Sequence, residues 1–228
     1  MSLEIKRKLN HVRIAMNNRL PHSNNHTNSK QLILIGPTLE TSITHDTLKK
    51  LHLENTPQIA IDGGIQFAHN PILWMGDGDS GSPTLSMPAL RKSTQDETDL
   101  RFCLNHIQDW SWEKLHLFGF LGKRKDHELA NLGEVYSVAK SRTKMEKAIF
   151  YNNSFTPEIF IFPAGKCSLP IHGLFSILTF EQSTVTVSGQ CEFKAHETIF
   201  TTLEGRGLSN RGFGLVQIQS SAPFLILT

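Results

Sequence analysis

A short apolar run leads directly into an acidic, glycine-rich turn in the stretch Ile72-Leu73-Trp74-Met75-Gly76-Asp77-Gly78-Asp79-Ser80. Four consecutive apolar residues without alternation are typical of a strand that is buried on both faces of a parallel sheet. The turn carries two carboxylates two residues apart, which repel each other unless a cation lies between them. Because Mg²⁺ prefers oxygen ligands, the stretch predicts a strand whose end binds a cation.

Working outward, similar apolar runs predict the other strands of this sheet, at residues 32–35, 58–61, 115–118 and 148–151. Helical patterns lie between them. Apolar residues at i, i+3, i+4 and i+7 from Leu100 predict one helix, and the capping-box spacing of Thr94 and Glu97 places its start just upstream. A second apolar face runs from Leu129 to Ala139. Residues 31–154 therefore predict an α/β domain with a doubly wound, mostly parallel sheet.

The pattern of apolar residues along the sequence changes near residue 155. Six closely spaced strand candidates follow, separated by Gly, Ser and Asn turns and with no helical stretch between them: residues 159–162, 174–180, 184–188, 197–201, 214–219 and 223–227. Residues 155–228 therefore predict an all-β sandwich or jelly-roll-like domain.

Composition excludes several classes of protein. The net charge of +2 is too small to indicate a nucleic-acid-binding protein. The longest apolar runs have four residues, far below the ~20 of a membrane-spanning helix. Three scattered cysteines without a CxxC pair favour a reducing, cytoplasmic setting. Residues 1–30 carry six basic residues and one acid, and we expect a flexible arm there.

Three further loops resemble the Asp77 turn in charge and glycine content. They are Asp62-Gly63-Gly64, Gln95-Asp96-Glu97-Thr98-Asp99 and Gly122-Lys123-Arg124-Lys125-Asp126-His127. Ligands of a doubly wound sheet bind beyond the carboxyl ends of its strands, where these loops should meet. Many carboxylates beside cations predict a site for a metal ion and a polyphosphate.

Two other ligand-binding motifs can be excluded for the Asp77 turn. The spacing Gly76-x-Gly78-x-x-Gly81 matches a dinucleotide fingerprint, but Pro83 and Pro88 prevent the helix that should follow. A calcium loop is excluded because Pro88 occupies the twelfth position from Asp77, where a bidentate Glu belongs.

The four motifs, in this order, resemble those of the thiamine pyrophosphokinase (thiamine diphosphokinase) family, and the resemblance covers about residues 31–228. Softer matches follow at Phe175-Ser176, Gly189 and Leu208-Ser209-Asn210. The resemblance implies an enzyme that transfers diphosphate from ATP to thiamine, giving thiamine diphosphate and AMP. It also implies an α/β domain that binds Mg·ATP and a homodimer whose thiamine sites lie between subunits.

The family resemblance also implies which residues of this sequence form the site. It implies that Asp77, Asp79 and Asp99 hold Mg²⁺ and that Arg124 and Asp126 join them in catalysis. The implied nucleotide site consists of Asp62, Gly63, Gly64, Thr98, Arg124, Asp126 and His127. The implied thiamine contacts are Gln95, Asp99, Ser209 and Asn210.

The sequence departs from the family pattern at several positions. Gly78 stands where an aromatic residue is usual, Lys123 replaces a glycine, and Arg211 stands where an acid is common. The three tryptophans lie before residue 113, so Phe213 or Phe224 is the expected stacking partner of thiamine. These departures leave open another acceptor alcohol, such as a hydroxymethylpterin. A non-catalytic nucleotide-binding relative and an unrelated metal-dependent phosphohydrolase are further alternatives.

Overall fold

The computed structural model describes residues 30–228, so the predicted arm, apart from Lys30, lies outside the described residues. The described chain is mostly β, with twelve strands and three α-helices. It divides into two compact units. One extends to Glu128 and also contains Tyr151–Thr156, and the other consists of Leu129–Phe150 and Pro157–Thr228. The division of function at residue 154 stays a prediction.

The first unit contains a parallel sheet of five strands. In the order β5-β1-β2-β3-β4, these are β5 (Lys114–Phe118), β1 (Gln31–Ile35), β2 (Gln58–Ile61), β3 (Leu73–Gly76) and β4 (Ala89–Arg91). The chain proceeds from β1 to β4 along one direction and then adds β5 on the other side of β1. Ligands of such sheets bind at the carboxyl ends of the strands, beside this reversal. Four of the predicted strands are confirmed here as β1, β2, β3 and β5, and β4 is an addition to them. The predicted strand at residues 148–151 also forms, but most of it belongs to the second unit.

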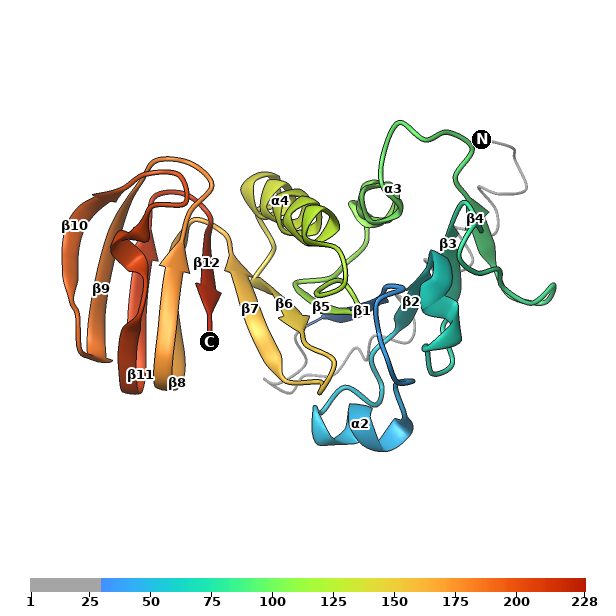
Figure 1. Ribbon diagram of the computed structural model, residues 1–228, viewed down its shortest axis with the longest axis horizontal. Coiled ribbons are helices and arrows are strands. Elements are labelled where there is room, and N and C mark those ends of the chain that lie inside the picture. Colours follow the sequence, from blue (N-terminus) through green and yellow to red (C-terminus); the bar gives the residue numbers. More distant parts are fainter. Residues whose placement is uncertain (1–29) are drawn as a thin grey trace. The chain divides into compact units, whose positions relative to one another are not determined.

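Helices cover the parallel strands on both sides. Figure 1 shows α2 (His45–Lys50) and α3 (Asp99–Ile107) on opposite faces of the strands. The connection from β2 to β3 contains only the 3₁₀ helix η1 (Asp62–Gln66), and the one from β3 to β4 has no helix. The doubly wound description therefore holds in part, with fewer crossover helices than predicted.

Helix α3 begins later than the capping-box spacing of Thr94 and Glu97 predicts. Thr98 is its N-cap, and the Thr98 hydroxyl accepts a hydrogen bond from the backbone N–H of Arg101 at 3.0 Å. The preceding segment is a loop, in which the side chain of Lys92 donates to the backbone oxygen of Glu97 at 2.9 Å. This contact ties residues 92–97 into a turn that precedes the helix.

The second unit contains antiparallel strands. Its strands are, in sheet order, β10 (Ala195–Phe200), β9 (Ser183–Cys191), β11 (Asn210–Ser220), β8 (Gly165–Leu178), β12 (Phe224–Leu227), β7 (Pro157–Phe162) and β6 (Lys147–Tyr151). The pairs from β10 to β7 are all antiparallel, as predicted. The short 3₁₀ helix η2 (Gly205–Gly207) precedes β11.

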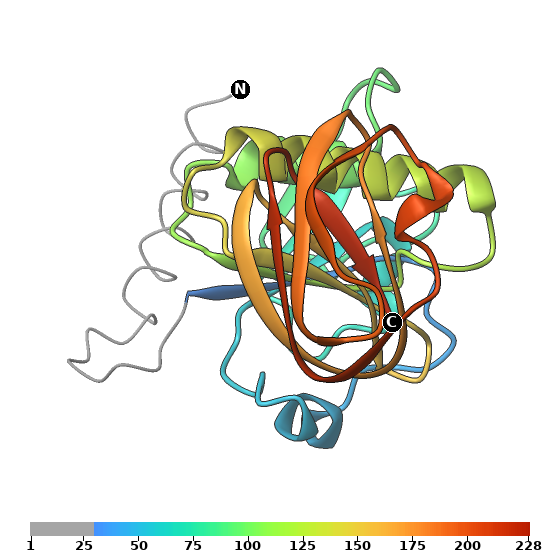
Figure 2. The ribbon, with the colours of Figure 1, turned by 90° about the vertical axis from the view of Figure 1, so that its left-hand side faces the viewer.

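Strand β8 joins the antiparallel strands into one hydrogen-bonded series. It pairs with β11 along Gly165–Phe175 and with β12 through Ser176–Leu178. The strands curve strongly (Figure 2), and side chains from β7 to β12 meet in one apolar core that includes Phe175, Val216 and Phe224. The predicted sandwich is confirmed in part, because these strands enclose one apolar core but are joined through β8 into one hydrogen-bonded series.

Helix α4 (Lys125–Ser141) buries only part of the face that the sequence predicts. Leu132, Val135, Tyr136 and Ala139 are buried, but Leu129 is 59% exposed. The apolar face is therefore buried only from Leu132 onward, and the first turns of the helix are mostly exposed to solvent.

The described part of the chain contains no helix that is both long enough and apolar enough to cross a bilayer. All three cysteines are free, and Cys103 and Cys191 are buried. Burial raises the pKa of the Cys103 thiol, so it stays protonated and unreactive at neutral pH.

Gly64 allows η1 to pack against the end of β1. A Cβ at this position would overlap the carbonyl carbon and oxygen of Ile35, which are backbone atoms and cannot turn away. We expect Gly64→Ala to lower the free energy of unfolding by at least about 2 kcal/mol. Urea titration followed by circular dichroism measures this change.

Gly133→Ala is the matched control, because this exposed position in α4 has no atom within 4 Å of a new Cβ. It should stabilise the protein by about 0.5–1 kcal/mol through the better helix propensity of alanine. Equal effects of the two substitutions would contradict the packing described for Gly64.

Candidate active site

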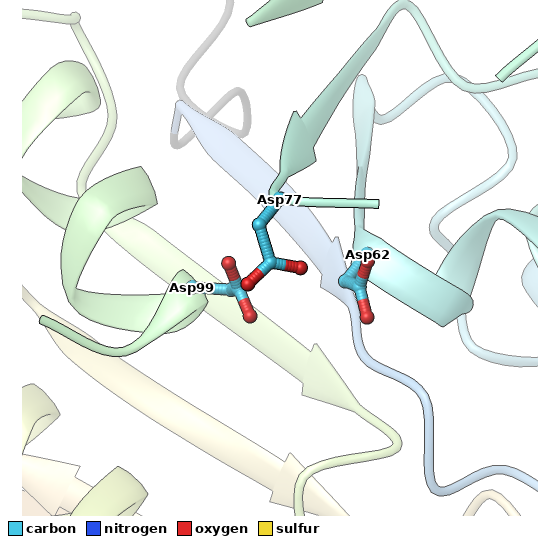
Figure 3. Close-up of side chains that lie close together, drawn as sticks. All are labelled: Asp62, Asp77 and Asp99. Atoms are coloured by element: carbon cyan, nitrogen blue, oxygen red, sulfur yellow. The ribbon is translucent and has the colours of Figure 1, made fainter. Parts of the chain in front are cut away.

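Three carboxylates from three separate elements converge beyond the ends of β2 and β3. Asp62 opens η1, Asp77 follows β3, and Asp99 opens α3 (Figure 3). One carboxylate oxygen from each lies within 4.8 Å of those of the other two. Because β2 and β3 are neighbouring parallel strands, their carboxyl ends bring Asp62 and Asp77 to the same edge. We call these three residues the carboxylate cluster.

Asp62 is fixed by two backbone contacts. The Asp62 side chain is buried, and its carboxylate accepts a hydrogen bond from the N–H of Gly78 at 3.2 Å. Its backbone oxygen accepts another from the indole N–H of Trp74 at 3.0 Å. These contacts hold Asp62 at a φ of +45°, a conformation that costs energy for a residue with a side chain. Burial also raises the pKa of the Asp62 carboxyl.

The other two carboxylates differ in their affinity for protons. The amide of Gln95 donates to Asp77 Oδ2 at 2.9 Å, and this hydrogen bond lowers the pKa of Asp77. Burial raises the pKa of Asp99, although Lys92 opposes this effect. Asp77 is therefore the member of the cluster that keeps its charge most readily as the pH falls.

Lys92, which was not among the predicted site residues, supplies a cation to the cluster. It directly follows β4, and its side chain is only 4% exposed. Its ammonium lies 3.1 Å from Asp99 Oδ1 and 3.7 Å from Asp77 Oδ2. Apart from the position of Lys92 between two acidic motifs, no signal in the sequence indicated this role, because the burial of its side chain is seen only in the structure.

Asp79 lies outside the carboxylate cluster. It is exposed, its backbone N–H donates to Asp77 Oδ1 at 3.1 Å, and its carboxylate accepts from the Ser80 hydroxyl at 2.8 Å. The structure thus brings Asp62 to Asp77 and Asp99 where the sequence analysis expected Asp79. The role of Asp79 as a metal ligand stays a prediction.

Arg91 fills the space above Gly78. The Arg91 guanidinium lies 5.3 Å from the centre of the Trp74 ring, and it donates to the backbone oxygen of Asp77 at 3.3 Å. A Cβ on Gly78 would lie 2.7 Å from the Arg91 Nη1 atom, and the φ of +88° at Gly78 further favours glycine. Arg91, which stacks on Trp74, therefore occupies the space that a side chain at position 78 would need.

The basic loop after β5 forms its own ion pair. Arg124 and Asp126 bind each other through two hydrogen bonds, both side chains are mostly exposed, and Arg124 lowers the pKa of Asp126 to about 2. His127 is also exposed. Lys123 has a φ of +56°, so its backbone keeps the left-handed conformation that a glycine would adopt there. Within the described residues, Asp126 is not part of the carboxylate cluster.

The other predicted nucleotide-site residues lie beside the cluster in sequence. Gly63 and Gly64 are buried in η1 directly after Asp62. Thr98 directly precedes Asp99 and caps α3, which fixes the direction from which Asp99 enters the cluster.

The predicted thiamine contacts of the second unit are engaged in local structure. The side-chain amide of Asn210 donates to the backbone oxygen of Phe193 at 2.7 Å and accepts from its N–H at 2.9 Å. Ser209 has a φ of +58°, and its N–H donates to the Ser176 hydroxyl at 3.2 Å. The expected thiamine contacts of Ser209 and Asn210 stay predictions.

The structure separates the two phenylalanines that were expected to stack on thiamine. Phe224 is fully buried and stacks on Phe162, with ring centres 5.4 Å apart. The prediction for Phe224 is therefore wrong, because core packing covers its ring. Phe213 is 57% exposed, so its ring is available to a ligand.

The carboxylate cluster fits a divalent cation of the Mg²⁺ type. It offers oxygen ligands of one charge from three fixed elements, which is the donor set that such ions prefer. Gly63, Gly76 and Gly78 allow the segments around these ligands to pack closely, because a Cβ on any of them would lie 2.7–3.1 Å from a neighbouring protein atom.

Comparison with known proteins agrees with this geometry. A family model described as "Thiamin pyrophosphokinase, catalytic domain" matches residues 48–147, which include the whole carboxylate cluster and Lys92. No curated protein matches the chain.

Solved structures share the fold. Thiamine pyrophosphokinase from Bacillus subtilis is similar with a TM-score of 0.69 and 18% identity, over 87% of this chain and 99% of that one. Thiamin pyrophosphokinase from Candida albicans has a TM-score of 0.66 and 15% identity, over 86% and 88% of the two chains. The catalytic-domain match covers residues 48–147, the segment in which Asp62, Asp77 and Asp99 meet, so this part of the chain is similar to the catalytic domain of thiamin pyrophosphokinases.

Proposed function

We propose that this protein is a thiamine diphosphokinase, which transfers a diphosphate from ATP to the hydroxyl of thiamine. The observation that carries this proposal is the carboxylate cluster inside the matched catalytic domain. Clustered carboxylates in a glycine-rich loop region are suited to a metal-bound polyphosphate.

Mg²⁺ is the proposed metal. Its proposed ligands are Asp62, Asp77 and Asp99, with Asp79 as a further ligand. When bound, the metal would neutralise charge on the phosphate oxygens of ATP. The chain itself keeps the carboxylates in place before any ligand arrives, through the contacts of Gly78 to Asp62 and of Gln95 to Asp77.

The reaction requires positioning more than covalent help from the protein. The thiamine hydroxyl oxygen attacks the β-phosphorus of ATP, and the bond from this phosphorus to the oxygen that bridges to the α-phosphate breaks. AMP leaves with that oxygen, and the thiamine hydroxyl releases its proton to solvent. Arg124 is proposed to stabilise charge on the phosphates, and Asp126 orients Arg124 through their ion pair.

The substrates are assigned to different parts of the chain. We assign ATP to residues 31–154, where Gly63, Gly64, Thr98 and His127 shape its site together with the catalytic residues. We assign thiamine to Gln95 and Asp99 of one subunit, with Ser209 and Asn210 and the aromatic Phe213 contributed by the other subunit of the proposed dimer. The exposure of the Phe213 ring supports this last assignment.

A homodimer is the proposed assembly. Leu174, Phe213 and Leu215 are all about half exposed or more. They share the outer face of β8 and β11, because Leu174 pairs with Arg211, two residues before Phe213. Exposed apolar side chains that gather on one face favour contact with another protein surface. The unpaired cysteines support the proposed cytoplasmic setting.

The purified protein should form AMP and thiamine diphosphate from Mg·ATP only when thiamine is present. Asp99→Ala should reduce kcat by about 100-fold or more, because it removes one electrostatic stabiliser of the transferred group. Chromatography of the products with mass identification measures both.

Asp109→Asn is the control for this experiment, because Asp109 is exposed and lies beyond the end of α3. It should retain wild-type turnover. AMP formation that requires an acceptor other than thiamine would overturn the choice of substrate, and no AMP with any acceptor would overturn the proposed activity.

The Mg²⁺ concentration that the protein needs for activity should rise as the pH falls. Burial raises the pKa of Asp62 and Asp99, so these groups take up protons at a higher pH than an ordinary aspartate does. Because the metal needs their ionised forms, the Mg²⁺ concentration for half-maximal activity should increase between about pH 7 and about pH 5. Mg²⁺ titrations of AMP formation across this range measure the effect, and a constant requirement would contradict it.

The combined variant Leu174→Glu and Leu215→Glu should be monomeric, because charges on the apolar face oppose its burial between two subunits. Leu85→Glu is the control, since Leu85 is fully exposed in the loop between β3 and β4. Sedimentation velocity should find a dimer for the wild type and for Leu85→Glu. A monomeric wild type, or a dimeric double variant, would rule out this interface.

A further inference from the structure

Lys92 lies against the carboxylate cluster, and the family resemblance gave it no role. Its ammonium contacts Asp99 at 3.1 Å and Asp77 at 3.7 Å, and it donates to the backbone oxygen of Glu97 at 2.9 Å. All three of its partners are oxygen atoms, and the side chain is almost completely buried. A lysine in such a position is held by its partners and cannot turn into solvent without breaking every contact.

The neighbouring residue holds Asp77 from the backbone. Arg91 donates to the backbone oxygen of Asp77, while Lys92 approaches the Asp77 carboxylate. Both cations come from the short edge strand β4 and its first following residue. Asp77 is thereby fixed through its main chain by one cation and through its side chain by the other.

The charges of the carboxylate cluster explain why a cation is needed in the free protein. Three carboxylates with oxygens within 4.8 Å repel one another, and desolvation strengthens this repulsion. The Lys92 ammonium reduces the net negative charge of the cluster by one. A divalent cation entering the cluster therefore meets a weaker attraction than the three carboxylates alone would exert.

We propose that Lys92 is a positioning residue that acts as the resident counter-cation of the metal site. It keeps Asp77 and Asp99 assembled when no metal is bound, and it weakens the binding of a free divalent cation. The site then binds metal well only together with the triphosphate, whose oxygens complete the ligand set. This inference rests on the proposed function for the identity of the nucleotide substrate.

Lys92 also links the metal ligands to the loop that carries Gln95. Its bond to the Glu97 oxygen closes residues 92–97 into a turn, and Gln95 from this turn donates to Asp77. Loss of the ammonium therefore loosens the metal ligands and the proposed thiamine contact together. Displacements of this kind reduce turnover even where the reacting groups are unchanged.

The test combines Mn²⁺ binding without nucleotide with turnover at saturating Mg·ATP and thiamine. Electron paramagnetic resonance of free Mn²⁺ measures the first. Lys92→Met should bind Mn²⁺ about 10-fold more tightly than the wild type, because a positive charge leaves the site. Its kcat should fall about 10-fold, because the carboxylates lose their fixed spacing.

Three further variants make the result decisive. Lys92→Arg keeps the charge and should keep the Mn²⁺ affinity of the wild type. Lys92→Gln removes the charge but keeps a donor for the Glu97 oxygen, so it should reproduce the tighter Mn²⁺ binding even where Lys92→Met folds poorly. Lys50→Met, at an exposed position of α2, should change neither quantity.

Tighter Mn²⁺ binding combined with slower turnover distinguishes this role from a purely structural one, because misfolding weakens both. Unchanged or weaker Mn²⁺ binding by Lys92→Met and Lys92→Gln would overturn the proposal. A wild type without thiamine-dependent AMP formation would overturn the proposed function instead, and the Mn²⁺ comparison would still decide the role of Lys92.

Discussion

The mutual repulsion of Asp62, Asp77 and Asp99 is the constraint on which the catalytic part of this molecule depends. A parallel sheet brings the ends of β2 and β3 to one edge, and α3 adds a third acid there. Such an arrangement is stable only if positive charge and hydrogen-bond donors compensate it. The chain supplies both, through Lys92, Gln95 and the N–H of Gly78.

The local structure around the cluster follows from this requirement. Strand β4 has only three residues, but it places Arg91 against Trp74 and Lys92 against the carboxylates. The left-handed backbone at Asp62 is a strained conformation, and the contacts of Trp74 and Gly78 hold it. Strain of this kind persists where the surrounding contacts determine the position of a functional group.

Much of the fold could be predicted from the sequence, because buried parallel strands leave unbroken apolar runs such as Leu32–Ile35. The joining of the antiparallel strands into one series could not, because it depends on the division of β8 between β11 and β12. The true start of α3 was also hidden, since the Thr94 and Glu97 spacing imitates a capping box while that segment is a loop in which Lys92 contacts Glu97.

The candidate site was predictable to the extent that acidic residues mark it. Asp77 and Asp99 were identified as cation ligands, and Asp62 was identified only as part of the nucleotide site. Lys92 was missed because Arg91-Lys92 reads as an ordinary solvated pair, and only the tertiary structure places its ammonium between two acids. Phe224 was chosen for its ring, but packing against Phe162 makes it a core residue.

The central claim is that these carboxylates form one site for a metal and a polyphosphate. Crystals of the protein grown with Mn²⁺ and a non-hydrolysable ATP analogue allow the metal to be located by its anomalous scattering. We expect an anomalous peak among the carboxylates of Asp62, Asp77 and Asp99, with phosphate oxygens completing the coordination of the metal. A peak elsewhere, for example beside Asp126, or bound nucleotide distant from these aspartates, would contradict the account.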